Sequence, residues 1–175
     1  THGVPGLFTM SQLPLSDNKH EYAQGWATDH RTPIEERWGG WYVSGTHGDM
    51  RHMGNEIAPK RAPTELNSEA GANVADLQDR IRLTPYLSPH SDIVALMVLE
   101  HQLQMHNFIT LANYEARSSL HHDDIMNTAL SREPSYRSDV TTRRIAAAGD
   151  KLLKYLLFTD EFQLTSPVAG VTSFA

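Results

Sequence analysis

The sequence predicts a mainly α fold, in which an irregular, Gly/Pro-rich N-terminal half packs on two long helices and one short helix. Proline and glycine interrupt residues 1–88 repeatedly, whereas residues 93–119 contain neither. Both residue types break regular structure, because proline removes a backbone donor and glycine frees the backbone. The chain is 39% hydrophobic and 21% charged, which is typical of a globular protein. We expect a single domain, or an internal fragment of a larger protein, with a loop-rich half (1–88) and a helical half (89–175).

In the loop-rich half, only two short elements are expected. Residues 41–44 favour a short strand. Residues 75–82 favour one or two helical turns, which end before Pro85 because a proline disfavours helical backbone in the residue ahead of it.

Three helices are expected after residue 88. Ser88 and Pro89 resemble an N-cap followed by proline at the first helical position, so a long helix is predicted over residues 93–119. A short helix is predicted over residues 122–130. A further long helix is predicted from Ser138 or Asp139 toward residue 158, weakened at Gly149 by about 1 kcal/mol relative to alanine.

Composition excludes several classes of function. The net charge of −6 does not favour binding to nucleic acid or anionic lipid. No segment reaches the roughly 18 consecutive apolar residues that a membrane span needs. The chain has no cysteine, so disulfides, cysteine-ligated zinc, iron–sulfur clusters and covalent haem attachment within it are excluded.

Residues 37–55, here called the aromatic segment, are the most unusual part of the chain. They contain three large aromatic residues, five glycines, two histidines and two methionines. Imidazole and thioether groups are ligands of haem iron and soft metals. We therefore expect a cofactor-binding wall, with His52 or Met53 as an axial haem ligand. The other residues of this predicted site are His47, Trp38, Trp41 and Tyr42. The alternative is that the aromatic segment folds over the helices as core.

The long helix offers a second candidate site. His101 and Met105 are four residues apart, so they lie on the same face and can contact a transition-metal ion. One helix cannot complete the coordination sphere, and the H-E-x-x-H motif is missing. Such a site therefore needs a loop histidine, and the alternative places both residues in the core.

Other sequence motifs give weaker evidence for a functional site. In residues 121–124, two histidines are followed by two aspartates, but adjacent helical residues diverge, so a solvated helix start is expected. Asp29 and His30 form an acid–imidazole pair, yet no G-x-S-x-G elbow accompanies them and hydrolase chemistry is not favoured. Dinucleotide and P-loop signatures are missing too.

Several of these stretches occur together, in order, in one known group of proteins. They include RWGGWYVSGTHG at residues 37–48, RHMGN at 51–55 and SPHSDIVALMVLEHQ at 88–102. With shorter stretches up to residue 170, they resemble uncharacterised exported bacterial proteins with a cytochrome c-like haem segment. That family carries a C-x-x-C-H motif ahead of a segment like residues 1–6, and this chain lacks the motif.

The resemblance implies a haem-associated electron-transfer protein, or a fragment of a c-type cytochrome-like exported protein. It implies a periplasmic or otherwise exported location, and a partner that is a redox protein or a haem-bearing segment outside this chain. Two alternatives stay open from the residues alone. One is a non-haem metal-binding module, with or without enzymatic activity, that uses loop and helix histidines. The other is a structural or assembly subunit without a cofactor.

Overall fold

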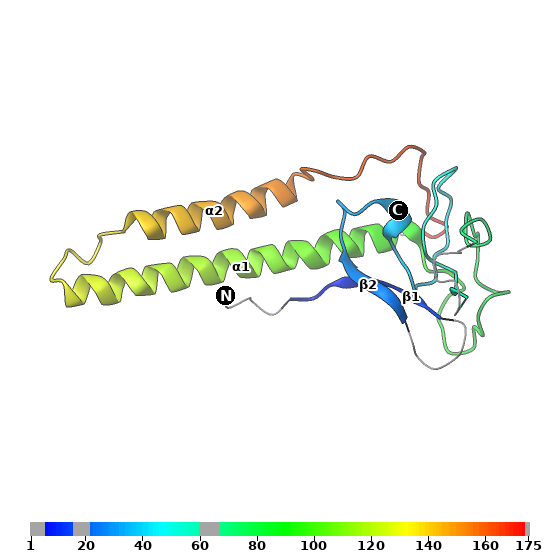
Figure 1. Cartoon of the computed structure of the whole chain (residues 1–175), viewed down its shortest axis with the longest axis horizontal. Coiled ribbons are helices and arrows are strands. Elements are labelled where there is room, and N and C mark those ends of the chain that lie inside the picture. Colours follow the sequence, from blue (N-terminus) through cyan, green and yellow to red (C-terminus); the bar gives the residue numbers. More distant parts are fainter. Residues whose placement is uncertain (1–5, 16–21, 60–66, 174–175) are drawn as a thin grey trace. The chain divides into compact units, whose positions relative to one another are not determined.

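The computed structural model describes residues 6–15, 22–59 and 67–173 (Figure 1). The elements in chain order are strands β1 (Thr9–Pro14) and β2 (Tyr22–Thr28), a 3-10 turn η1 (Ile34–Glu36), and helices α1 (Ile93–Ala129) and α2 (Asp139–Leu156). They form two compact units. The helical unit comprises Gln102–Thr159 and the residues up to Leu7, and the loop unit comprises Phe8–His101 and Asp160–Ala175.

The predicted mainly α fold with a third, short helix is wrong. In the described part of the chain there are two helices, and the N-terminal half contains an antiparallel two-stranded sheet instead of loops alone. The short helix expected over residues 122–130 is the last part of α1. The strand expected at residues 41–44 is not formed, although Ser44 makes an isolated bridge to Asp92. Residues 75–82 form turns and no helix.

The sheet escaped prediction in part because two of the three buried side chains of β1 are polar. Strand β1 alternates buried and exposed positions, and two of its buried residues are Thr9 and Ser11. The Thr9 hydroxyl donates to the carbonyl of Thr28 at 2.8 Å, so the buried group has a partner across the sheet.

Helix α1 begins at Ile93, as predicted, but it is capped by Asp92, so the predicted N-cap at Ser88 is wrong. Asp92 Oδ1 accepts the backbone N–H of Val94 at 2.9 Å. Its Oδ2 accepts from the N–H of Val171 at 2.7 Å and from that of Thr172 at 2.9 Å. One carboxylate therefore caps the helix and holds the C-terminal segment of the loop unit.

The core of the loop unit is built around the aromatic segment and the start of α1. Its buried residues are Ile34, Trp38, Val43, Met50, Ile93 and Leu96. Trp38 is 2% exposed and has a backbone φ of 63°, a left-handed conformation that is strained for a bulky residue. Trp38 and Val43 therefore lie in the core, as in the alternative prediction for the aromatic segment.

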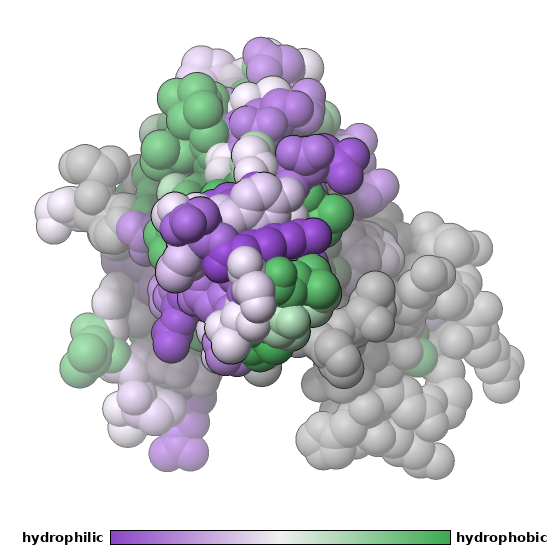
Figure 2. Space-filling view, turned by 90° about the vertical axis from the view of Figure 1, so that its left-hand side faces the viewer, coloured by the Kyte–Doolittle hydropathy of each residue, from purple (hydrophilic) through white to green (hydrophobic). Residues whose placement is uncertain are grey.

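The helical unit is a hairpin of the later part of α1 and α2, which lie side by side in Figure 1. The predicted helix from Ser138 is confirmed, with the Ser138 hydroxyl accepting from the backbone N–H of Thr141. The rings of Phe108 and Tyr155 lie 5.0 Å apart, and Arg144 pairs with Glu115 at 2.9 Å. Two helices bury only the faces that meet. Apolar side chains accordingly remain at the surface, among polar ones (Figure 2), at Ile109, Ile125, Val140, Leu153 and Leu157.

No helix in the described ranges is long and apolar enough to cross a membrane. This agrees with the expectation drawn from the hydrophobic runs of the sequence.

Two glycines make a matched test of this packing. Gly45 has a φ of 142°, and an added Cβ would overlap Ile93 and lie 2.9 Å from the Ala169 carbonyl oxygen. We expect Gly45→Ala to lower the free energy of unfolding by about 2 kcal/mol. Gly149 lies in α2 with nothing within 4 Å of that position, so Gly149→Ala should raise it by about 1 kcal/mol. Urea denaturation measures both, and equal effects would contradict this packing.

Candidate functional site

The aromatic segment is folded back on itself by its own backbone. The N–H of Met53 donates to the Arg37 carbonyl at 3.0 Å, and that of Asn55 donates to the Trp41 carbonyl at 2.8 Å. The Asn55 side chain accepts from the N–H of Val43 at 2.8 Å and donates to its carbonyl at 2.7 Å. This closed loop fixes where its histidines and methionines lie.

His47 is fully buried, and both of its ring nitrogens are hydrogen-bonded. Nδ1 lies 2.8 Å from the Met50 carbonyl, to which it donates, and Nε2 accepts the backbone N–H of Asn73 at 3.0 Å. Burial lowers the pKa of His47, so the ring is neutral. Binding iron through either nitrogen would break one of these bonds inside the core.

His52 is also enclosed. Its Nδ1 accepts the N–H of Gly54 at 3.0 Å, and its ring lies 5.3 Å from that of Trp38 and 4.8 Å from that of His47. Burial, reinforced by His47 and Arg51, lowers its pKa to about 3. The ring therefore stays neutral over the physiological range.

The remaining residues of the predicted haem site make separate contacts. Met53 is partly buried, and its sulfur accepts from the Ser11 hydroxyl at 3.9 Å. The Trp41 indole donates to the Met10 carbonyl at 2.7 Å, and Tyr42 is 44% exposed. Haem ligation by Met53 or His52 stays a prediction, and the contacts of His47 do not favour it.

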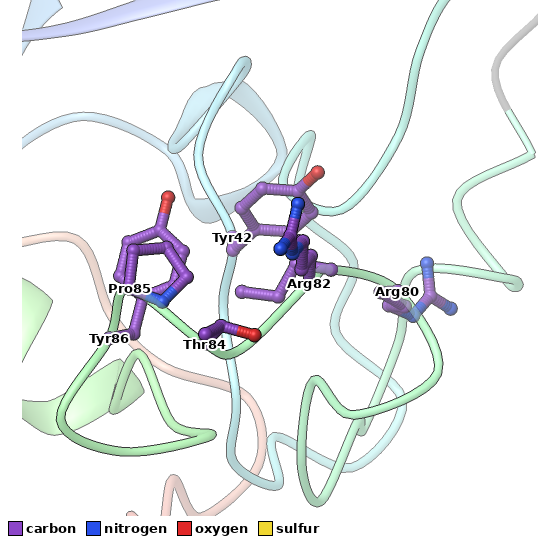
Figure 3. Close-up of a pocket in the computed structure, with 7 residues that line it drawn as sticks. Tyr42, Arg80, Arg82, Thr84, Pro85 and Tyr86 are labelled. Carbon is purple, nitrogen blue, oxygen red and sulfur yellow. The ribbon is translucent and has the colours of Figure 1, made fainter.

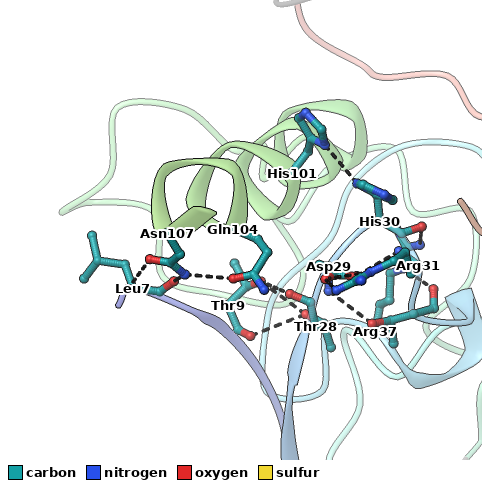
Figure 4. Close-up of polar contacts among 11 residues, drawn as sticks. Leu7, Thr9, Thr28, Asp29, His30, Arg31, Arg37, His101, Gln104 and Asn107 are labelled. Atoms are coloured by element: carbon teal, nitrogen blue, oxygen red, sulfur yellow. Dashed lines mark hydrogen bonds and ion pairs between the residues drawn. The ribbon is translucent and has the colours of Figure 1, made fainter. Parts of the chain in front are cut away.

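A different pair of histidines is brought together in the loop unit. His30 follows β2, and His101 lies on the third turn of α1. Their Nδ1 atoms are 2.9 Å apart, and the ring centroids are 5.0 Å apart (Figure 4). The His30 carbonyl accepts from Arg37 at 2.8 Å and from the N–H of Phe162 at 3.1 Å, which fixes the backbone below the ring. His30 is 4% exposed.

A buried ion pair lies one residue before His101. Arg37 Nη1 is 3.3 Å from Glu100 Oε2, and these side chains are 3% and 1% exposed. The Thr28 hydroxyl donates to Glu100 Oε1 at 2.7 Å, and Arg37 Nε donates to the Thr32 carbonyl at 2.7 Å. Burial raises the pKa of Glu100 to about 7, against the lowering effect of Arg37. The carboxyl group is therefore protonated more readily than that of an exposed glutamate.

Both members of the histidine pair are neutral at pH 7. Burial is the main cause that lowers the pKa of His30, and His101 lowers it further, although Asp29 opposes both. Burial likewise lowers the pKa of His101, against Glu161 and Asp29. A neutral imidazole presents the lone pair that a metal ion needs.

The sequence identified His101 but missed its partner. Met105, expected beside it, is partly buried one turn later on α1 and belongs to the helical unit. The loop histidine that the metal hypothesis requires is His30, whose acid–imidazole context was visible, but the contact spans 71 positions. Among the described residues, no group of three or more His, Asp or Glu side chains is placed to hold a metal ion. What the described geometry brings together is a pair of imidazole nitrogens.

Comparison with known proteins gives no match to a protein family, a curated protein or a solved structure. The resemblance to exported cytochrome c-like proteins therefore stays a prediction.

Proposed function

We propose that the loop unit binds a divalent transition-metal ion through Nδ1 of His30 and His101. The observation that carries this is their Nδ1–Nδ1 distance of 2.9 Å. With metal–nitrogen bonds of about 2.05 Å, that separation gives a ligand–metal–ligand angle of about 90°. A tetrahedral ion would need the nitrogens about 3.3 Å apart. The spacing therefore favours Cu²⁺ or Ni²⁺ in tetragonal or octahedral geometry over tetrahedral zinc.

The same distance also suits a hydrogen bond between two neutral imidazoles. In the metal-free pair one Nδ1 carries the proton and the other accepts it. Metal binding requires that proton to move to Nε2 of the same ring or to solvent. The metal-free and metal-bound pairs therefore differ in the position of one proton. The fold thus holds both ligands in register before the ion arrives.

Two histidine ligands leave several coordination positions open. Structural metal sites are closed by protein ligands, whereas open positions take water or an added ligand. His101 is only partly buried, in contrast to His30, which gives the ion a way in. This supports exchangeable metal binding at the two histidines.

The test is competition for Cu²⁺ and Ni²⁺ with a chromophoric chelator, in the wild type and in His101→Gln. We expect the variant to lose at least about 100-fold in affinity, because loss of a direct ligand exceeds the 10–100-fold cost of losing an outer-shell group. His106→Gln is the matched control, since His106 is an exposed histidine of α1. Equal affinities in all three proteins would contradict the proposal.

An absorption spectrum of the purified chain separates this function from haem-linked electron transfer. Haem gives a Soret band with sharp α and β bands after reduction, whereas a Cu²⁺ site of nitrogen ligands gives none of these. A colourless protein that takes up neither metal would favour the structural or assembly subunit.

A further inference from the structure

A second candidate site lies in the loop unit, at the exposed Tyr42 of the aromatic segment. It is a cavity of about 640 Å³ (Figure 3), within the range typical of small-molecule sites. Its lining residues are Tyr42, Arg80, Ile81, Arg82, Thr84, Pro85 and Tyr86. A smaller cavity of about 250 Å³ shares Tyr42 and Arg80 with it. We call the two together the Tyr42 groove.

Positive charge is concentrated in the Tyr42 groove, although the chain as a whole carries a net charge of −6. Arg80 donates to the carbonyls of Asn55, at 3.1 Å, and Ala70. Carbonyls hold a guanidinium in place without neutralising it. Arg82 is exposed, and within the described ranges no carboxylate lies at ion-pair distance from it. The groove therefore presents Arg82 without a carboxylate partner, whereas Arg80 is held by carbonyls and its charge is partly offset by Glu56 in the smaller cavity.

Two aromatic rings stand beside these cations. Tyr42 is 44% exposed and Tyr86 is 62% exposed, and in Figure 3 both hydroxyl groups point to the same side. Tyr42 comes from the closed aromatic segment, whereas Tyr86 comes from the turn in which its N–H donates to the Leu83 carbonyl at 2.8 Å. Exposed rings on two separate, hydrogen-bonded segments form a surface on which a planar group can pack.

We propose that the Tyr42 groove binds a small aromatic anion, with its ring against Tyr42 and Tyr86 and its carboxylate or phosphate on Arg82. Arginine binds either oxyanion with two parallel hydrogen bonds, which a neutral ligand cannot match. Among the described residues that line either cavity, Glu56 is the only acidic one, and it lines the smaller cavity. Repulsion of an anion from the larger cavity is therefore weak.

The probes are phenyl phosphate and benzoate, compared with inorganic phosphate and benzyl alcohol, in saturation-transfer NMR titrations of the full chain. We expect at least one aromatic anion to bind more than tenfold tighter than inorganic phosphate and benzyl alcohol, and the stronger of the two identifies the oxyanion. Arg82→Gln and Tyr86→Ala should each weaken that binding at least tenfold. Arg143→Gln, which alters an exposed arginine of α2, should leave it unchanged.

Three results would overturn the proposal: no binding by either aromatic anion, equal binding of benzyl alcohol, or equal loss in Arg143→Gln. Both groove variants change exposed side chains, so folding is retained and is checked by circular dichroism. The outcome is independent of metal binding at His30 and His101, because none of the probes is a metal ion.

Discussion

Replacing Arg37 with alanine should lower the free energy of unfolding by about 3–5 kcal/mol at pH 8, where Glu100 is ionised, which is the usual cost of removing one partner of a buried ion pair. Glu100 would keep its buried position with the Thr28 hydroxyl as its remaining hydrogen-bond donor. The carbonyls of His30 and Thr32 would also lose the guanidinium that they accept from. Urea denaturation followed by circular dichroism measures the change.

An exposed ion pair is the control for that variant. Arg137 lies 3.2 Å from Asp124, with the two side chains 38% and 58% exposed, so Arg137→Ala should cost less than about 1 kcal/mol. Glu100→Gln should also be strongly destabilising, because it leaves the Arg37 guanidinium buried without its carboxylate partner. A loss of under 1 kcal/mol in Arg37→Ala would show that the ion pair is not buried in solution.

Acid should destabilise the fold, and His52 should be the largest single cause. Its pKa is about 3 in the folded state, compared with 6.5 for an ordinary histidine. Between those values the unfolded chain binds a proton that the folded chain does not. Stability is therefore complete above pH 6.5 and is lost as pH falls toward 3, by about 5 kcal/mol in total. His30, His47 and His101 add in the same direction.

Glu100 partly offsets the loss of stability on acidification between pH 7 and pH 4.5. Its pKa is raised to about 7 from an ordinary 4.5, so between those values the folded state holds the extra proton. Stability from Glu100 is present below pH 4.5 and falls as pH rises through 7, by about 3 kcal/mol. The net loss on acidification should consequently be shallow between pH 6.5 and 4.5 and steep below 4.5.

Urea denaturation at half-unit pH intervals tests this profile. His52→Gln should be less stable than the wild type at pH 7 and should show a flatter decline below pH 4.5. His106→Gln, an exposed histidine variant, should reproduce the wild-type slope. A His52→Gln profile parallel to that of the wild type would mean that this ring is protonated in the folded protein.

Helix α2 was predictable because its signals are local: Ser138 caps it, and no proline follows before it ends. Helix α1 was predicted to end ten residues early because residues 121–124 are a polar run. In the structure Asp123 accepts from the Ser138 N–H and hydroxyl, each at 2.8 Å. That contact crosses 15 positions, so helical periodicity alone could not show why the helix continues.

The candidate site was predictable only in part, because its contacts also join residues that are far apart in the sequence. The aromatic segment was expected to be a cofactor-binding wall, with a place in the core as the alternative. Its imidazoles are engaged by backbone groups that the sequence does not reveal, such as the N–H of Asn73 on His47. His101 was predicted as a metal ligand from its place on the helix. Its partner His30 comes from a turn after β2, a strand that was not expected in the Gly/Pro-rich half of the chain.

Electron paramagnetic resonance of the protein with one equivalent of Cu²⁺ tests metal binding at His30 and His101 most directly. The proposed site predicts a tetragonal Cu²⁺ spectrum with nitrogen hyperfine splitting, reduced or lost in His30→Gln and His101→Gln and retained in His106→Gln. Identical spectra in all of these proteins would contradict it.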